Sequence, residues 1–75
     1  MTLSIEYCNS WNYLPRASRM AADLLDKFGT NISKLTLVPS SGGVYEVTKN
    51  DKIIFSKKEL NRFPELEEII TLIES

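Results

Sequence analysis

Residues 2–28 have the sequence TLSIEYCNSWNYLPRASRMAADLLDKF, and the spacing of the apolar residues changes within this stretch. In residues 2–7 every second residue is apolar, and a period of two predicts a strand with one buried face. From about residue 13 to residue 28 the apolar residues recur at helical spacing, and Gly29 is well placed to end that helix. The stretch therefore predicts a strand that leads into an amphipathic helix.

The rest of the chain predicts three more strands and a second helix. Residues 32–38 alternate between apolar and polar side chains, and Pro39–Gly43 forms a loop by composition. Residues 44–48 and 52–55 form two short strands around Asn50-Asp51, a pair that tolerates the positive φ of a tight hairpin turn. A final helix is expected to open at Pro64, since a proline in the first turn loses no hydrogen bond.

The order strand–helix–strand–strand–strand–helix predicts an α/β fold, a two-layer sandwich with both helices on one face of a four-stranded mixed sheet. A right-handed crossover makes the first two strands parallel, and the tight turn makes the last two antiparallel. Residues 8–13, 39–43 and 56–63 should then meet at one edge of the sheet. The open face should carry polar residues and two apolar ones, a surface for weak homodimerisation: Glu6, Lys34, Thr36, Glu46, Thr48, Val44 and Ile54.

Composition narrows the classes of function. The 75 residues predict a single domain over residues 1–75, and a net charge of −1 argues against nucleic acid or an anionic membrane as partner. The chain has one cysteine and no histidine, so we expect no internal disulfide, no metal site and no bound cofactor. A small fold without disulfides, and without a recognisable secretory leader, favours the cytoplasm. A nucleic-acid-binding sandwich is the least favoured alternative.

The single cysteine, Cys8, is the candidate catalytic residue. It follows a strand and precedes a helix, where unpaired backbone N–H groups and the positive end of the helix dipole lower a thiol pKa. The thiolate is the attacking species in disulfide exchange, so this interpretation requires Cys8 to be accessible. The alternative is a small buried apolar residue, as most lone cysteines are.

Several segments resemble the selenoprotein W-related (Rdx) family in the same order along the chain. They cover residues 3 to 73 and include Ile5–Cys8, Arg16-Ala17, Met20-Ala21, Gly42–Val47, Ile54–Lys58 and Arg62–Glu65. The resemblance implies a thioredoxin-like fold with a cysteine–x–x–cysteine or selenocysteine motif at the end of the first strand. It also implies redox activity linked to glutathione and to protein thiols.

Within that resemblance Cys8 matches the first position of the motif, and Trp11 stands at the second. A full dithiol cycle is therefore excluded. Cys8 alone could form a mixed disulfide with glutathione as a co-substrate or with a protein thiol, which a second thiol would release. The activity is then at most that of a monothiol oxidoreductase. Pro15 also departs from the family, and a helix start near Tyr13 would keep it within the first turn.

The remaining candidate binding residues surround Cys8 in the predicted fold. Trp11 either packs over the motif loop or anchors a partner, and Arg16 either stabilises an anion near Cys8 or is simply solvated. The backbone of the 39–43 loop either binds a peptide or is a flexible turn. The alternative function is a non-catalytic protein-interaction module that has lost its dithiol. The tentative binding set is Trp11, Tyr13, Arg16, Pro39, Ser41, Gly42 and Gly43.

Overall fold

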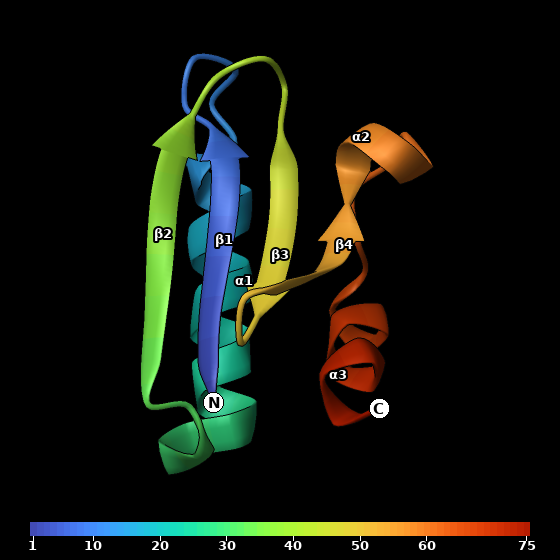
Figure 1. Ribbon diagram of the computed structural model, residues 1–75. Coiled ribbons are helices and arrows are strands. Elements are labelled where there is room, and N and C mark those ends of the chain that lie inside the picture. The colour runs from blue at the N-terminus through green and yellow to red at the C-terminus, as the bar shows by residue number, and fades with distance from the viewer.

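A computed structural model describes all 75 residues as a four-stranded sheet with helices (Figure 1). The strand order is β2-β1-β3-β4, so β1 and β3 are central and β2 and β4 are edges. The elements are β1 (Thr2–Cys8), α1 (Leu14–Phe28), a 3₁₀ turn (Gly29–Asn31), β2 (Lys34–Ser40), β3 (Tyr45–Lys49), β4 (Lys52–Ser56), α2 (Lys57–Leu60) and α3 (Leu66–Glu74).

The pairing of the strands follows the prediction from the sequence. β1 and β2 are parallel, with Cys8 opposite Ser40, and β1 and β3 are antiparallel. β3 and β4 form a hairpin in which Asn50 and Asp51 have φ values of 48° and 71°. The side chain of Asn50 also accepts a hydrogen bond of 2.9 Å from the backbone N–H of Thr2, which ties this turn to the start of β1.

One apolar core lies between the sheet and the two longer helices, α1 and α3, which both cover the same face (Figure 1). β1 supplies the residues predicted to face inward, and α1 and α3 each supply one apolar stripe. The fourteen residues of the core are Leu3, Ile5, Tyr7, Ala17, Met20, Ala21, Leu24, Ile32, Tyr45, Val47, Phe55, Ile69, Ile70 and Ile73. The two-layer arrangement is therefore confirmed.

β2 has the expected seven residues but lies two residues further along the chain, because it starts at Lys34 and not at residue 32. Pro39 and Ser40 therefore belong to the strand and not to the loop that follows it. Proline is tolerated in an edge strand, where no neighbour on the outer side needs its missing N–H group. The prediction that the loop begins at Pro39 is wrong. The connection between β2 and β3 covers residues 41–44.

The C-terminal part differs from the prediction at two points. Residues Lys57–Leu60 form a short helix, α2, that was not expected. α3 begins at Leu66 and not at Pro64, because Glu65 is its N-cap and forms a capping box with Glu68. None of the helices is both long and apolar enough to cross a membrane.

A β-bulge changes which isoleucine lies on the open face of the sheet. Val47 pairs with Phe55 and Thr48 pairs with Ile53, so Ile54 is the extra residue and packs against the core. Ile53 is 56% exposed instead. The expectation that Ile54 faces outward is wrong, since the extra residue shifts the alternation of the strand by one position.

Candidate functional site

Three segments meet at the edge of the sheet where β1 ends, as predicted. The backbone N–H of Cys8 donates to the carbonyl of Val44 at 2.8 Å, and that of Asn9 donates to the carbonyl of Ser40 at 2.9 Å. Ser56, at the end of β4, pairs with Glu46 on β3. The loops after β1 and β2 therefore lie against each other, and α2 follows at the same end of the molecule (Figure 1).

Residues 9–13 form a tight turn between β1 and α1. The N–H of Asn12 donates to the carbonyl of Asn9 and the N–H of Tyr13 donates to the carbonyl of Cys8, both at 3.1 Å. Asn12 has a φ of 60°, a conformation that asparagine adopts more readily than most residues. α1 then starts at Leu14 with Pro15 in its first turn, so the proline removes no hydrogen bond.

The donors around the Cys8 sulfur come from loops and not from the start of α1. The Ser10 hydroxyl lies 3.4 Å from Cys8 Sγ, and the backbone N–H groups of Gly43, Trp11 and Ser10 also point to the sulfur. Burial raises the pKa of the Cys8 thiol, but these hydrogen bonds together outweigh burial and hold the pKa below its ordinary value. The loops thus favour the thiolate.

Cys8 is not accessible in this conformation, contrary to expectation: its exposed fraction is 0%. Yet it does not belong to the fourteen-residue core. It lies at the end of a strand beneath two short loops, at the periphery of the molecule, and its neighbours include polar backbone groups. The loops that hold Ser10, Trp11 and Gly43 therefore form part of the cover of the sulfur.

Trp11 rests on the glycine loop with most of its side chain in solvent. It is 61% exposed, and a Cβ atom at Gly43 would lie only 2.6 Å from Cζ3 of the indole. Gly43 also has a φ of 74°, so it is required both by its conformation and by the close approach of the ring. Trp11 thus packs over the 41–43 loop and presents an exposed aromatic surface, whereas anchoring of a partner stays a prediction.

Tyr13 and Arg16 belong to an aromatic cluster and not to the surroundings of the sulfur. The ring of Tyr13 packs edge-on against Phe63, with centroids 4.8 Å apart, and Phe63 packs in the same way against Tyr45 at 5.6 Å. The Arg16 guanidinium lies 3.9 Å from the centroid of the Phe63 ring, and the Lys57 ammonium 5.3 Å from it. Arg16 is therefore held by Phe63.

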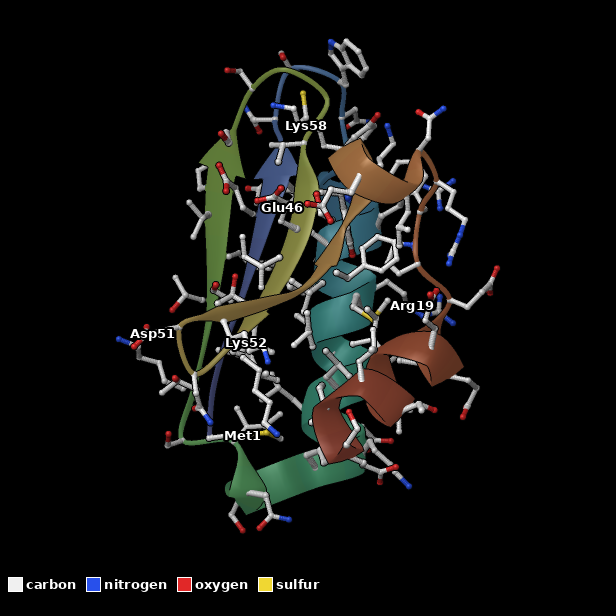
Figure 2. The ribbon with its side chains drawn as sticks, turned by 45° about the vertical axis from the view of Figure 1, so that its right-hand side comes forward. Met1, Arg19, Glu46, Asp51, Lys52 and Lys58 are labelled. Atoms are coloured by element: carbon white, nitrogen blue, oxygen red, sulfur yellow. The ribbon has the colours of Figure 1, made fainter.

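A groove of about 660 Å³ opens beside the loops that cover Cys8. Of the tentative binding set, it includes Trp11, Ser41, Gly42 and Gly43, whereas Pro39 lies on the outer strand and outside the groove. Glu46 and Lys58, which also line it, lie at the end of the molecule far from Met1 (Figure 2). Seven further lining residues lie outside the tentative binding set: Glu6, Ser40, Val44, Glu46, Lys57, Lys58 and Asn61.

These omissions have an identifiable cause. Residues 56–63 were expected at this edge, so the position of Lys57 and Lys58 was within reach of the sequence. That Lys57 and Lys58 lie beside Glu46 could not be predicted, because this arrangement depends on the short helix α2. No group of three or more histidine, cysteine, aspartate or glutamate side chains is arranged to hold a metal ion.

Comparison with known proteins identifies the family. The profile of the Rdx family matches residues 2–75. The chain belongs to the Rdx family. A comparison with curated proteins found no significant match.

Two crystal structures resemble this Rdx protein closely. One, of a protein from Bordetella parapertussis, has 30% sequence identity and a TM-score of 0.94, and the match covers 97% of this chain and 92% of the other. The second, of a selenoprotein W-related protein from Vibrio cholerae, has 27% identity and a TM-score of 0.93, with 97% and 91% covered. The predicted thioredoxin-like α/β fold and the family are thus both confirmed.

Proposed function

We propose that this Rdx protein carries out thiol exchange through Cys8 alone, forming a mixed disulfide with glutathione or with a protein thiol in the cytoplasm. Membership of the Rdx family indicates a redox-type function. The observation that carries the finer proposal is the set of donors around the sulfur, which lowers the pKa of the Cys8 thiol in spite of burial. A lowered pKa increases the thiolate fraction near neutral pH.

The exchange uses one sulfur of the protein, one external disulfide and one external thiol. The Cys8 thiolate attacks one sulfur of a disulfide, a new S–S bond forms, and the other half leaves as a thiolate. Because the chain has no second cysteine, an external thiolate must attack the mixed disulfide and release Cys8 again. Each step exchanges one S–S bond for another, so no further oxidant is required.

The closed conformation sets a condition on this chemistry. Cys8 has no exposed surface, so the loops around it, at residues 9–13 and 41–43, must move before a disulfide can reach the sulfur. The measured rate is then the rate of the open form multiplied by its population. We expect Cys8 to react more slowly than a free thiolate of the same pKa.

Alkylation tests the proposal directly, because every adduct must be on Cys8. The rate of reaction with iodoacetamide is followed by mass spectrometry from pH 5 to 10. The profile of rate against pH should have its midpoint below 9.0, the ordinary pKa of a cysteine thiol. Ser10→Ala removes the side-chain donor and should move the midpoint up, toward that value. Incubation with glutathione disulfide should add one glutathione to the wild type.

Two results would contradict the proposal. One is a midpoint at or above 9.0 in the wild type. The other is a failure of glutathione disulfide and of a peptide disulfide to form any adduct under conditions in which iodoacetamide reacts. The first result would show that the pKa of the Cys8 thiol is not lowered, and the second would show that Cys8 does not exchange with disulfides.

A non-catalytic interaction module is the second candidate function. It is favoured by one contrast at this end of the molecule: Cys8 is fully buried, whereas Trp11 is 61% exposed. Exposed tryptophan is enriched at binding hot spots. This function predicts that Cys8→Ser keeps the partner and Trp11→Ala loses it, measured by quantitative co-purification. The redox function predicts the reverse.

A further inference from the structure

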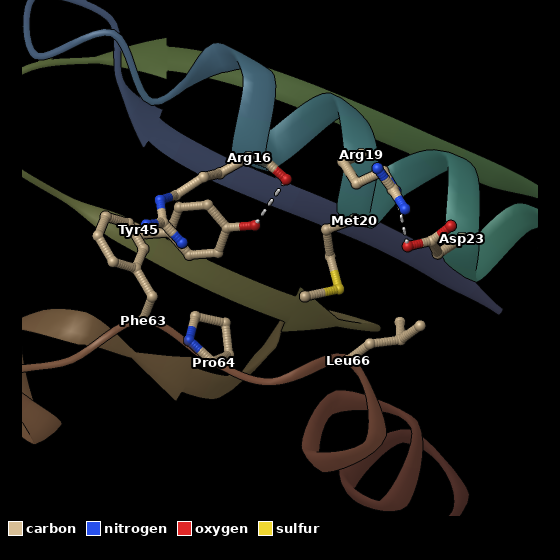
Figure 3. A pocket seen from close by; sticks show the side chains of 8 residues that line it. All are labelled: Arg16, Arg19, Met20, Asp23, Tyr45, Phe63, Pro64 and Leu66. Atoms are coloured by element: carbon tan, nitrogen blue, oxygen red, sulfur yellow. Dashed lines mark hydrogen bonds and ion pairs between the residues drawn. The ribbon is translucent and has the colours of Figure 1, made fainter.

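We propose that the cavity between α1 and residues 63–66 binds a small carboxylic acid with an apolar body, through the guanidinium of Arg16. The cavity has a volume of about 260 Å³ and shares no lining residue with the groove beside Cys8. Figure 3 shows Arg16 and Arg19 on the α1 side, with Phe63, Pro64 and Leu66 opposite. This proposal does not depend on the redox function.

Arg16 is the one charge in the cavity without a counter-ion. Arg19 and Asp23 also line it, but they neutralise each other through a contact of 3.5 Å between Nε and Oδ2. The other ion pair of the chain joins Arg62 to Glu68, so neither pair involves Arg16. The lining therefore carries a net charge of +1 at one position.

The guanidinium of Arg16 is oriented before any ligand arrives. The central carbon of the guanidinium lies 3.9 Å from the centroid of the Phe63 ring. This contact restricts the side chain and leaves the N–H groups at the edge of the guanidinium free to donate. A fork held in this way loses less conformational entropy on binding a carboxylate than a mobile arginine would. Arg16 is thus suited to donate hydrogen bonds to both oxygens of one carboxylate.

The rest of the lining suits an apolar body. Met20, Pro64 and Leu66 project toward the space between α1 and the segment before α3 (Figure 3). The hydroxyl of Tyr45 donates to the backbone carbonyl of Arg16 at 3.5 Å, so it already has an acceptor. Apart from the compensated Arg19–Asp23 pair, only Arg16 offers free polar groups, and a ligand needs a polar group at one end only.

Size and charge define the class of ligand. Sites for drug-sized ligands usually measure about 300–1,000 Å³, so a cavity of about 260 Å³ fits a molecule of fragment size. One arginine compensates a single negative charge, as on a carboxylate, whereas a phosphate monoester would retain uncompensated charge. A monocarboxylic acid with a short aliphatic chain meets both conditions. Its dissociation constant should be on the order of 1–10 mM, given its few atoms.

The test uses hexanoate and two molecules of the same length. ¹⁵N and methyl NMR spectra of the full chain are recorded during titration to 30 mM hexanoate at low salt. Saturable shifts are expected at Arg16 Nε–H and at Met20 and Leu66. Hexan-1-ol and hexylamine should bind at least about fivefold more weakly, because neither can replace the charge-assisted hydrogen bonds to a carboxylate.

Arg16→Gln and Lys27→Gln provide the matched variants. Both remove one positive charge from an exposed position on α1, but Lys27 lies in the last turn and outside the cavity. Hexanoate should bind Arg16→Gln at least about fivefold more weakly and Lys27→Gln unchanged. Unchanged shifts of β1 amides in both variants show that the fold is intact. Equal binding of the two variants, equal binding of hexan-1-ol, or no saturable shift at 30 mM would each overturn the proposal.

Discussion

Replacing Gly43 by alanine tests the contact between Trp11 and the loop beside Cys8, and Gly42 provides a matched control. The two glycines are neighbours with φ values of 79° and 74°, so alanine is strained to a similar extent at either position. A Cβ atom at Gly42 meets nothing within 4 Å, whereas one at Gly43 meets the indole ring. The difference between the two variants therefore isolates the contact with Trp11.

The magnitudes follow from the geometry. A left-handed conformation costs a non-glycine residue roughly 1–2 kcal/mol, so both variants should unfold at lower temperature, by about 4–8 °C for each kcal/mol. In Gly43→Ala the contact of 2.6 Å must also open to at least the 3.4 Å of an ordinary contact, so the indole has to move by at least 0.8 Å. Because most of the ring is in solvent, it can move without unfolding the chain.

Two measurements report the displacement. Trp11 is the only tryptophan, so the emission spectrum belongs to this residue alone and should shift in Gly43→Ala but not in Gly42→Ala. Displacement of the ring also loosens the loop over Cys8. If the closed loop loses about 1 kcal/mol, the open population and the alkylation rate rise roughly fivefold.

The outcome that refutes this reasoning is equality of the two variants. If Gly42→Ala and Gly43→Ala have the same emission spectrum and the same alkylation rate after correction for their stability, the indole does not rest on Gly43. A faster reaction in both variants, without a difference between them, would show that strain in the loop and not Trp11 controls access to the sulfur.

Three further predictions concern titrating groups. Glu68→Ala should lower the melting temperature by a few degrees more than Glu67→Ala, because it removes the hydrogen bond from Arg62. That hydrogen bond lowers the pKa of Glu68, so the stabilisation it provides is lost as pH falls through this pKa, and the difference between the two variants should vanish at acid pH. Burial raises the pKa of Tyr45 to about 12, so stability in urea should fall as pH rises from 10 to 12, and less in Tyr45→Phe. The stability of the wild type relative to Cys8→Ser should increase as pH rises toward 9.0, because the folded state lowers the thiol pKa.

The sequence predicted the order and the pairing of the strands because the relevant signals are local. The alternation in β1 and the turn at Asn50-Asp51 depend on neighbouring residues alone. The bulge at Ile54 was missed because it does not alter the composition of the strand. It is visible only in the partner strand, where Thr48 pairs with Ile53. Pro39 was assigned to a loop because an edge strand cannot be recognised before the strand order is known.

The sequence predicted where the candidate site lies but not that the Cys8 sulfur is buried in it. That Cys8 lies beside residues 41–43 follows from the topology, and the structure agrees. The burial of the sulfur depends on how a short turn folds over it, through Asn12 and Trp11, and no periodicity encodes this. Arg16 is one turn along α1 as expected, but its position is decided by Phe63, which lies 47 residues away in the sequence. Weak self-association through the open face of the sheet stays a prediction.

Pro39 has a consequence for how another molecule can approach. β2 is the outer strand next to β1, and an outer strand can normally recruit a foreign strand through its free N–H and C=O groups. Pro39 interrupts that row of donors one residue before the strand ends, opposite Tyr7. Pairing of a guest strand with β2 would therefore lack one hydrogen-bond donor at the end of the strand nearest Cys8. A protein substrate of the proposed exchange would therefore have to contact side chains near Cys8 and not extend the sheet at this end of β2.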